Sequence, residues 1–138
     1  MVETHQRFGR KNGKGFYDYT PGAAKRLWAG LAQFQNASCN LDELDIEQIK
    51  FRLLATQALE AARTMDEGIV EDPREADIGA ILGFGFAPFT GGPLSMIDGL
   101  GVNNFNSKCD ALKSRYGERF NVPPLLRAME SRKSRFYN

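Results

Sequence analysis

The chain has 138 residues, of which 42% are hydrophobic and 25% charged, and this composition fits one soluble globular domain. Eighteen basic residues against seventeen acidic ones leave a formal net charge of +1, which gives no reason to expect a nucleic-acid partner. No apolar run approaches the roughly 20 residues of a membrane span, and the residues after Met1 form no signal-peptide core. The sequence therefore predicts a protein of the bacterial cytoplasm or of an organelle matrix.

Residues 1–20 are predicted to form an irregular lead-in segment, followed by a helical domain over residues 21–138. Three glycines in the seven residues from Gly9 to Gly15 disfavour a helix there. A glycine turn can hold a phosphate through its backbone N–H groups, and charge would come from three cations in the same stretch, Arg10, Lys11 and Lys14. The alternative is a turn with a structural role only, because the spacing matches neither a dinucleotide fingerprint nor a P-loop.

A first helix is expected directly after the lead-in. Thr20 is a suitable N-cap and Pro21 a suitable first helical residue. Apolar residues then recur at helical spacing from Ala24 to Ala32. Residues 36–40 are expected to be the loop that ends this helix.

The second predicted helix is the longest and the central one. It is expected to begin at Asp42 or Asp45, either of which can cap it, and to end at Gly68. Its apolar residues form one stripe that is predicted to face the core, comprising Ile46, Ile49, Leu53, Leu54, Ala58, Ala61, Ala62 and Met65.

A third helix begins in a compact start signal. Asp72 caps it, Pro73 takes the first helical position, and Glu75 is placed to reach back to the capping backbone. The helix is expected to stop in the glycine-rich loop Phe84–Pro93. The loop's three aromatic rings would either form an apolar surface for a partner or an acyl chain, or pack into the core: Phe84, Phe86 and Phe89.

Three shorter helices are expected after this loop, over residues 94–100, over residues 105–116 and from Pro123 onward. No stretch alternates polar and apolar residues convincingly enough to predict a strand. The fold class is therefore all-α, a single domain of about five to six helices.

Catalytic, metal-binding and cofactor-binding residues are not expected in this chain. His5 is the only histidine, and no orienting partner is evident for it. The two cysteines, Cys39 and Cys109, are far apart, have no CxxC spacing, and are predicted to be reduced thiols. The carboxylates are explained by helix starts and exposed faces.

Four segments together are similar in order and spacing to the C-terminal helical domain of 3-hydroxyacyl-CoA dehydrogenases. They are Phe8–Tyr19, Glu60–Asp77, Leu82–Pro93 and Asp98–Gly101, within a resemblance that spans about residues 7–130. A Gly-Phe-Tyr segment followed by a helical copy resembles the second copy in the multifunctional alpha subunit of fatty-acid oxidation. The resemblance implies a fold like the C-terminal domain of 6-phosphogluconate dehydrogenase.

The same resemblance implies a role without catalysis. In catalytic copies the long helix begins with an Asn-Arg pair whose Asn contacts the substrate, whereas the matching positions here are Phe51 and Arg52, and Phe cannot make that hydrogen bond. The family's NAD-binding domain and its catalytic His–Glu pair are not among these residues. The implied role is domain packing, or dimer-like association with dehydrogenase core domains or a second copy, in a parent enzyme that uses NAD in beta-oxidation. The alternative is a freestanding acyl-CoA-binding or adaptor domain that uses the Phe84–Pro93 loop.

Overall fold

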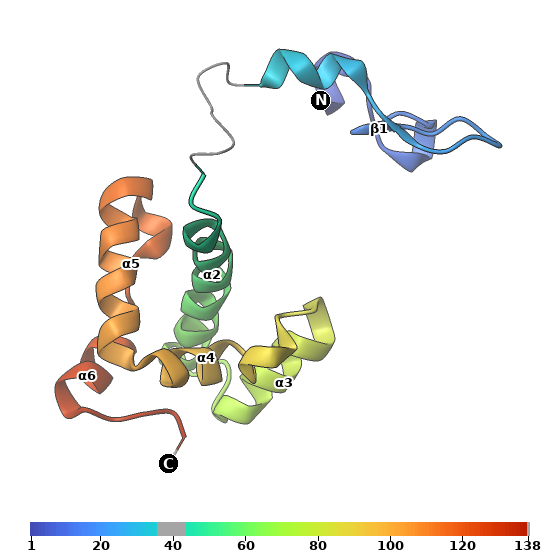
Figure 1. Ribbon diagram of the computed structural model, residues 1–138. Helices are drawn as coiled ribbons and strands as arrows, with labels where there is room; N and C mark the ends of the chain where they lie inside the picture. The colour runs from blue at the N-terminus through green and yellow to red at the C-terminus, as the bar shows by residue number, and fades with distance from the viewer. Residues whose placement is uncertain (36–43, 138) are drawn as a thin grey trace. The chain divides into compact units, whose positions relative to one another are not determined.

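The computed structural model describes residues 1–35 and 44–137 (Figure 1). Contacts between residues divide the chain into two compact units, Met1–Leu44 and Asp45–Asn138. The predicted all-α class is confirmed, since α-helices and short 3-10 helices dominate and the described residues contain only a small two-stranded sheet. No helix in the described part is long and apolar enough to cross a bilayer.

The N-terminal unit is built from short elements: α1 (Val2–His5), η1 (Arg10–Asn12), β1 (Tyr17–Asp18), β2 (Arg26–Leu27) and η2 (Ala29–Phe34). β1 pairs antiparallel with β2, with Tyr17 opposite Leu27 and Asp18 opposite Arg26. The prediction of an α-helix after Thr20 is therefore wrong, as is the absence of strands. The expected end of that helix, at residues 36–40, lies outside the described residues.

Two features explain why this segment is not an α-helix. Gly22, one residue after the predicted helix start, has a left-handed φ of 77° that interrupts helical geometry. The following residues then pair with the lead-in, because the backbone N–H of Trp28 donates to the carbonyl of Phe16 at 2.9 Å. Trp28 in turn covers the buried guanidinium of Arg7 at 4.3 Å. Local packing on the lead-in thus overrides the helical spacing of the apolar residues.

Arg7 holds the N-terminal unit together. Its Nε donates to the carbonyl of Gly15 at 2.7 Å and one terminal nitrogen donates to that of Tyr17 at 3.3 Å. The same guanidinium forms an ion pair with Asp18. A buried charge with this many partners is stabilised rather than free to bind a ligand.

The helical unit follows the predicted order of elements closely. Its elements are α2 (Ile46–Asp66), α3 (Pro73–Phe84), η4 (Pro88–Thr90), α4 (Pro93–Leu100), α5 (Val102–Tyr116), η5 (Glu118–Phe120) and α6 (Pro124–Arg132). α4 packs against α2, α3 and α5, and α6 packs against α2 and α5 (Figure 1). α4 is therefore the common neighbour around which the larger helices are arranged.

Side-chain caps set the starts of α2 and α3 as predicted. Asp45 accepts a hydrogen bond from the backbone N–H of Gln48 at 2.9 Å, while the alternative cap Asp42 lies outside the described residues. Asp72 accepts from the backbone N–H of Arg74 at 2.9 Å. The reciprocal bond expected from Glu75 is not found in the described part of the chain. Asp72 also forms an ion pair with the guanidinium of Arg74.

The core-facing side of α2 matches the predicted stripe only in part, at Ala58 and Ala62. Four fully buried side chains define it: Ala55, Ala58, Leu59 and Ala62. Leu53 is instead 65% exposed, Ile46 is also exposed, and Leu54 and Ala61 are only partly buried. Periodicity alone allowed either stripe, and the contact with α4 selects the one that contains Leu59. Small Ala58 and Ala62 let the apolar helix α4 approach closely, with Leu94 and Ile97 fully buried there.

Candidate interaction surface

The structure separates the three phenylalanines of the Phe84–Pro93 loop. Phe84, the last residue of α3, is 66% exposed, and Phe89 in η4 is 87% exposed. Phe86 between them is 1% exposed and belongs to the hydrophobic core. Both predicted placements therefore occur, since one ring lies in the core and two are exposed. Of the three, Phe84 and Phe89 are available to a partner.

Glycines with left-handed geometry make this loop turn. Gly85 ends α3 with φ 76°, and the N–H of Phe86 then donates to the carbonyl of Ala80 at 3.1 Å, which turns its ring inward. Gly92 has φ 122°, and a Cβ there would lie 2.4 Å from the Asp77 side chain. A side chain at position 92 is thus excluded both by the backbone and by Asp77.

Asp77 is a buried carboxylate that fixes the loop to the start of α4. It accepts hydrogen bonds from the backbone N–H groups of Leu94 at 2.7 Å and Ser95 at 3.0 Å, and from the Ser95 hydroxyl at 2.6 Å. The Tyr137 hydroxyl donates a further bond at 2.7 Å. With its oxygens occupied by these four donors, Asp77 serves as an interior helix cap at the start of α4.

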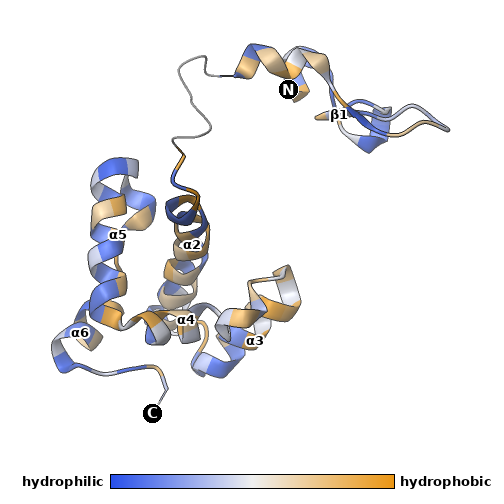
Figure 2. Cartoon of the chain, in the orientation of Figure 1, coloured by the Kyte–Doolittle hydropathy of each residue, from blue (hydrophilic) through white to orange (hydrophobic). Residues whose placement is uncertain are grey.

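The outer side of α3 carries apolar side chains that nothing in the described structure covers. Ile78 is 57% exposed and Leu82, one turn later, is 81% exposed. Together with Phe84 and Phe89 they form what we call the α3 apolar surface, whose hydrophobic colouring is visible at the C-terminal end of α3 in Figure 2. The spacing of Ile78 and Leu82 was visible in the sequence, but it matched the pattern of a core-facing stripe.

A groove of about 390 Å³ borders this surface, between α2 and α3. Its α2 side is formed by Gln57, Glu60, Ala61 and Thr64, and its α3 side by Glu75, Ala76, Gly79, Ala80 and Phe84, with Val70 at the end nearest the α2–α3 connection. The residues that line the groove are mostly small or apolar, so another helix can approach closely there.

The cations of the lead-in are exposed, and the backbone N–H groups of its three glycines are already paired. The N–H groups of Gly9, Gly13 and Gly15 all donate to backbone carbonyls within the N-terminal unit. Arg10, Lys11 and Lys14 form no ion pair among the described residues, and the Arg10 guanidinium lies 5.9 Å from the Tyr19 ring centroid. The three glycine N–H groups are therefore not available to an anion, whereas the three cationic side chains are.

Phe51 and Arg52 contact α5 and take part in helix packing. The Phe51 ring lies 6.1 Å from that of Phe105 in an edge-to-face arrangement. The Arg52 guanidinium lies 3.7 Å from the ring centroid of Tyr116, whose hydroxyl donates to Gln48 at 3.0 Å. Both positions thus connect the first half of α2 to α5.

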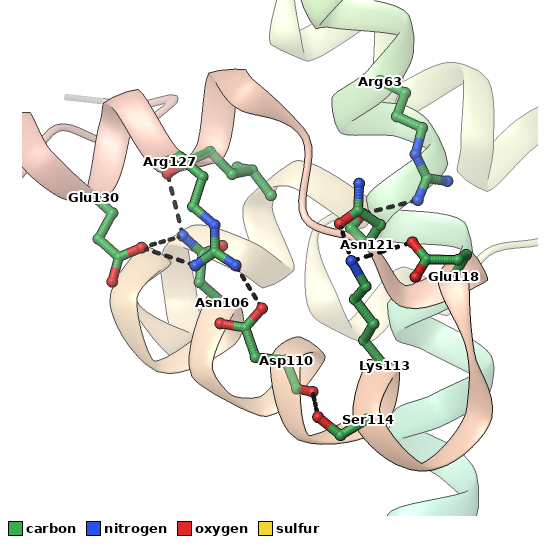
Figure 3. Close-up of polar contacts among 10 residues, drawn as sticks. Arg63, Asn106, Asp110, Lys113, Ser114, Glu118, Asn121, Arg127 and Glu130 are labelled. Atoms are coloured by element: carbon green, nitrogen blue, oxygen red, sulfur yellow. Dashed lines mark hydrogen bonds and ion pairs between the residues drawn. The ribbon is translucent and has the colours of Figure 1, made fainter.

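A polar network on α5 and α6 was not predicted (Figure 3). Arg127 of α6 forms ion pairs with Asp110 of α5 and with Glu130, and the buried amide of Asn106 donates to Glu130 at 2.8 Å. On the other side of the picture, Lys113 donates to Asn121 at 2.9 Å. Apart from the i,i+3 pair of Arg127 and Glu130, these partners lie 8 to 24 residues apart, so local spacing does not predict them. The network connects α5 to α6 and to the segment between them.

The remaining candidates for chemistry lie in packed surroundings. His5 packs edge-on against Trp28 and Phe34. Cys109 is fully buried on α5, and burial, aided by Asp110, raises the pKa of its thiol to about 12. Cys39 lies outside the described residues. No group of three or more metal-binding side chains occurs within residues 1–35 and 44–137.

No family model matches the chain. The chain is, however, 39% identical over 136 residues to the fatty acid oxidation complex subunit alpha of Shewanella sp. (strain ANA-3), a match that covers 95% of this chain and 19% of that protein. The proteins of the same name from Shewanella oneidensis and Shewanella frigidimarina are 41% and 39% identical, with the same coverage.

The chain thus spans about a fifth of the length of the relatives it matches. By its fold the chain belongs to the all-α class, apart from the short N-terminal unit. In sequence it is a homologue of one part of the fatty acid oxidation complex subunit alpha, which confirms the resemblance predicted above.

Proposed function

We propose that this chain is a non-catalytic helical domain of a fatty-acid oxidation multifunctional enzyme, and that it packs through the α3 apolar surface against another helical domain. The partner is a dehydrogenase core domain or a second copy of the chain. The similarity to one segment of the alpha subunits supports the parent enzyme. The cytoplasm of a bacterium, or an organelle matrix, remains the proposed compartment.

The observation that carries the packing role is the exposure of four large apolar side chains on one helix and the turn after it: Ile78, Leu82, Phe84 and Phe89. Scattered exposed apolar residues are normal, whereas four large ones between residues 78 and 89 indicate a contact surface. Burial of each such side chain stabilises an interface by roughly 1.5–3 kcal/mol. Glu75 and Gln57 at the groove give this surface the polar margin of an interface.

Sedimentation velocity over a concentration series tests this proposal with the full chain. Self-association that rises with concentration is expected, and Leu82→Lys is expected to abolish it. Leu53→Lys is the matched control, because Leu53 has comparable exposure on another helix, α2, and it should associate like the wild type. A strictly monomeric wild type at hundreds of micromolar, with no association to added dehydrogenase core domains, would contradict the proposal.

The absence of catalysis is part of the same proposal. The position where catalytic copies of the resembled family carry a substrate-contacting Asn holds Phe51, whose ring packs on Phe105. We expect pure chain to form no NADH from NAD and a 3-hydroxyacyl-CoA above background. Steady NADH formation that survives repeated purification would contradict this, whereas NAD chemistry in the parent enzyme would not.

The alternative, a freestanding acyl-CoA-binding or adaptor domain, is favoured by one observation. Phe84 and Phe89 present exposed rings that offer apolar contact to an acyl chain. Isothermal titration with palmitoyl-CoA tests it. Saturable binding that is lost in Phe89→Ser and kept in Leu53→Lys would support this alternative over the packing role.

A further inference from the structure

We propose that the groove between α2 and α3 receives one amphipathic helix of the partner, and that the end of this helix over the α2–α3 connection is basic. The inference rests on the proposed packing function and goes further, because it names the chemistry of the partner segment.

The groove has the shape that a helix requires. α2 and α3 both pack against α4, and their facing sides are lined by small side chains, chiefly Ala61, Ala76 and Ala80. Small residues let a third helix approach to the 8–10 Å interaxial distance of packed helices. The α3 side extends from Glu75 to Phe84, which at 1.5 Å per residue gives a length of about 14 Å, or two to three helical turns.

Gly79 leaves the α3 side of the groove without a side chain near its middle. It lies inside α3, where a glycine lowers helix stability by roughly 0.5–1 kcal/mol relative to alanine. A Cβ built at this position meets nothing within 4 Å. The position is therefore open, and a partner helix can approach α3 closely there.

Charge distinguishes the two ends of the groove. From Asp66 to Glu75 the chain carries five acidic residues and a single basic one, Arg74, which pairs with Asp72. The carboxylates of Asp66, Glu67, Glu71 and Glu75 are exposed and take part in no ion pair within the described residues. Because Val70 and Glu75 line the groove at this connection, its end is negative there. At the other end Phe84 lies with Gln57 and Glu60, and the Glu60 carboxylate is already paired with Arg63. The complementary helix is therefore basic at one end and apolar along its face.

A labelled synthetic helix provides a direct test with the full chain. The probe is a fluorescein-labelled helical peptide of about 14 residues, with Leu and Ala along one face and lysines confined to one end. Its acidic counterpart carries glutamates in place of the lysines. Fluorescence anisotropy is measured against the wild type and against Gly79→Leu, which fills the groove. The matched control is Gly99→Leu, because Gly99 is also a helical, exposed glycine with open space around its Cβ position.

The lysine peptide is expected to bind the wild type and Gly99→Leu alike, and to bind Gly79→Leu at least about tenfold more weakly. Glu75→Lys is expected to weaken the lysine peptide and strengthen the acidic one. No binding of the lysine peptide at millimolar concentration, equal binding by Gly79→Leu, or a wild-type preference for the acidic peptide would overturn the inference. If self-association still depends on Leu82 in that case, the packing function stands and only the helix-in-groove proposal fails.

Discussion

The hydroxyl of Tyr137 donates a 2.7 Å hydrogen bond to the carboxylate of Asp77, 60 residues earlier in the chain. The backbone beside it is held as well, because Asp98 accepts from the N–H groups of Phe136 at 3.1 Å and Tyr137 at 2.9 Å. The segment after α6 is thereby attached to α3 and α4, the two helices that present the candidate interaction surface. Removal of these contacts should loosen that surface before it unfolds the core.

Tyr137→Phe is expected to lower the free energy of unfolding at pH 7 by about 0.5–1.5 kcal/mol, the usual range for one hydrogen bond. Burial, together with the bond to Asp77, raises the pKa of the Tyr137 hydroxyl to about 12, against 10.0 ordinarily. The neutral hydroxyl therefore stabilises the fold fully below about pH 10, and this stabilisation is lost as the pH rises toward 12. Urea titrations of both proteins from pH 7 to 11 should show the difference shrinking above pH 10. A difference that is constant with pH would contradict this reading.

Gly92→Ala is expected to be strongly destabilising, by about 2–4 kcal/mol. A Cβ at this position would lie 2.4 Å from the buried Asp77 side chain, and the φ of 122° is one that alanine rarely adopts. Thermal unfolding followed by circular dichroism measures the effect. Gly99→Ala is the control, and it should be neutral or slightly stabilising because its Cβ would meet open space in a helix. Equal melting temperatures for the two variants would contradict the packing of Asp77 against Gly92.

Asp72→Ala is expected to lower the urea midpoint, because it removes the cap that accepts from the Arg74 N–H. Asp72→Asn should lose less, since an asparagine oxygen can still cap the helix. Hydrogen bonds from Arg74 lower the pKa of the Asp72 carboxyl. The contribution of the ionised form is therefore present above the unfolded value of 3.8 and is lost as the pH falls below it. Identical midpoints for wild type and Asp72→Ala at pH 7 would show that Asp72 is not the cap.

Helix boundaries in the second unit were predictable because their signals are local. Asp72 and Pro73 start α3, Gly68 follows α2 with a left-handed φ, and Gly117 ends α5. Each depends on the backbone needs of one residue and its neighbours within a turn. The helix predicted after Thr20 was wrong because its conformation depends on a contact that is not local, the pairing with the lead-in.

The candidate site was only partly predictable, because exposure is decided by distant partners. The sequence singled out the rings of the loop, but it did not show that Phe86 turns inward while Phe89 points to solvent. Ile78 and Leu82 have the spacing of a buried stripe, and only the packing of α3 on α4 leaves them outside. The acidic composition of residues 66–75 was visible in the sequence. The sequence did not show that these residues lie at one end of a groove.

The last prediction concerns which side of α2 faces the core. Leu59 is fully buried and Leu53 is largely exposed, so the two leucines of one helix form a matched pair. Leu59→Ala is expected to lower the free energy of unfolding by about 2–5 kcal/mol, as core truncations do. Leu53→Ala should change it by no more than about 0.5 kcal/mol, and the partly buried Leu54 should lie between them when truncated. Urea unfolding separates these values easily.

Because Ala55, Ala58 and Ala62 leave Leu59 as the large side chain of this face, its loss creates a cavity that they cannot fill. A larger loss in Leu53→Ala than in Leu59→Ala would mean that α2 is rotated and that α4 packs on its other side.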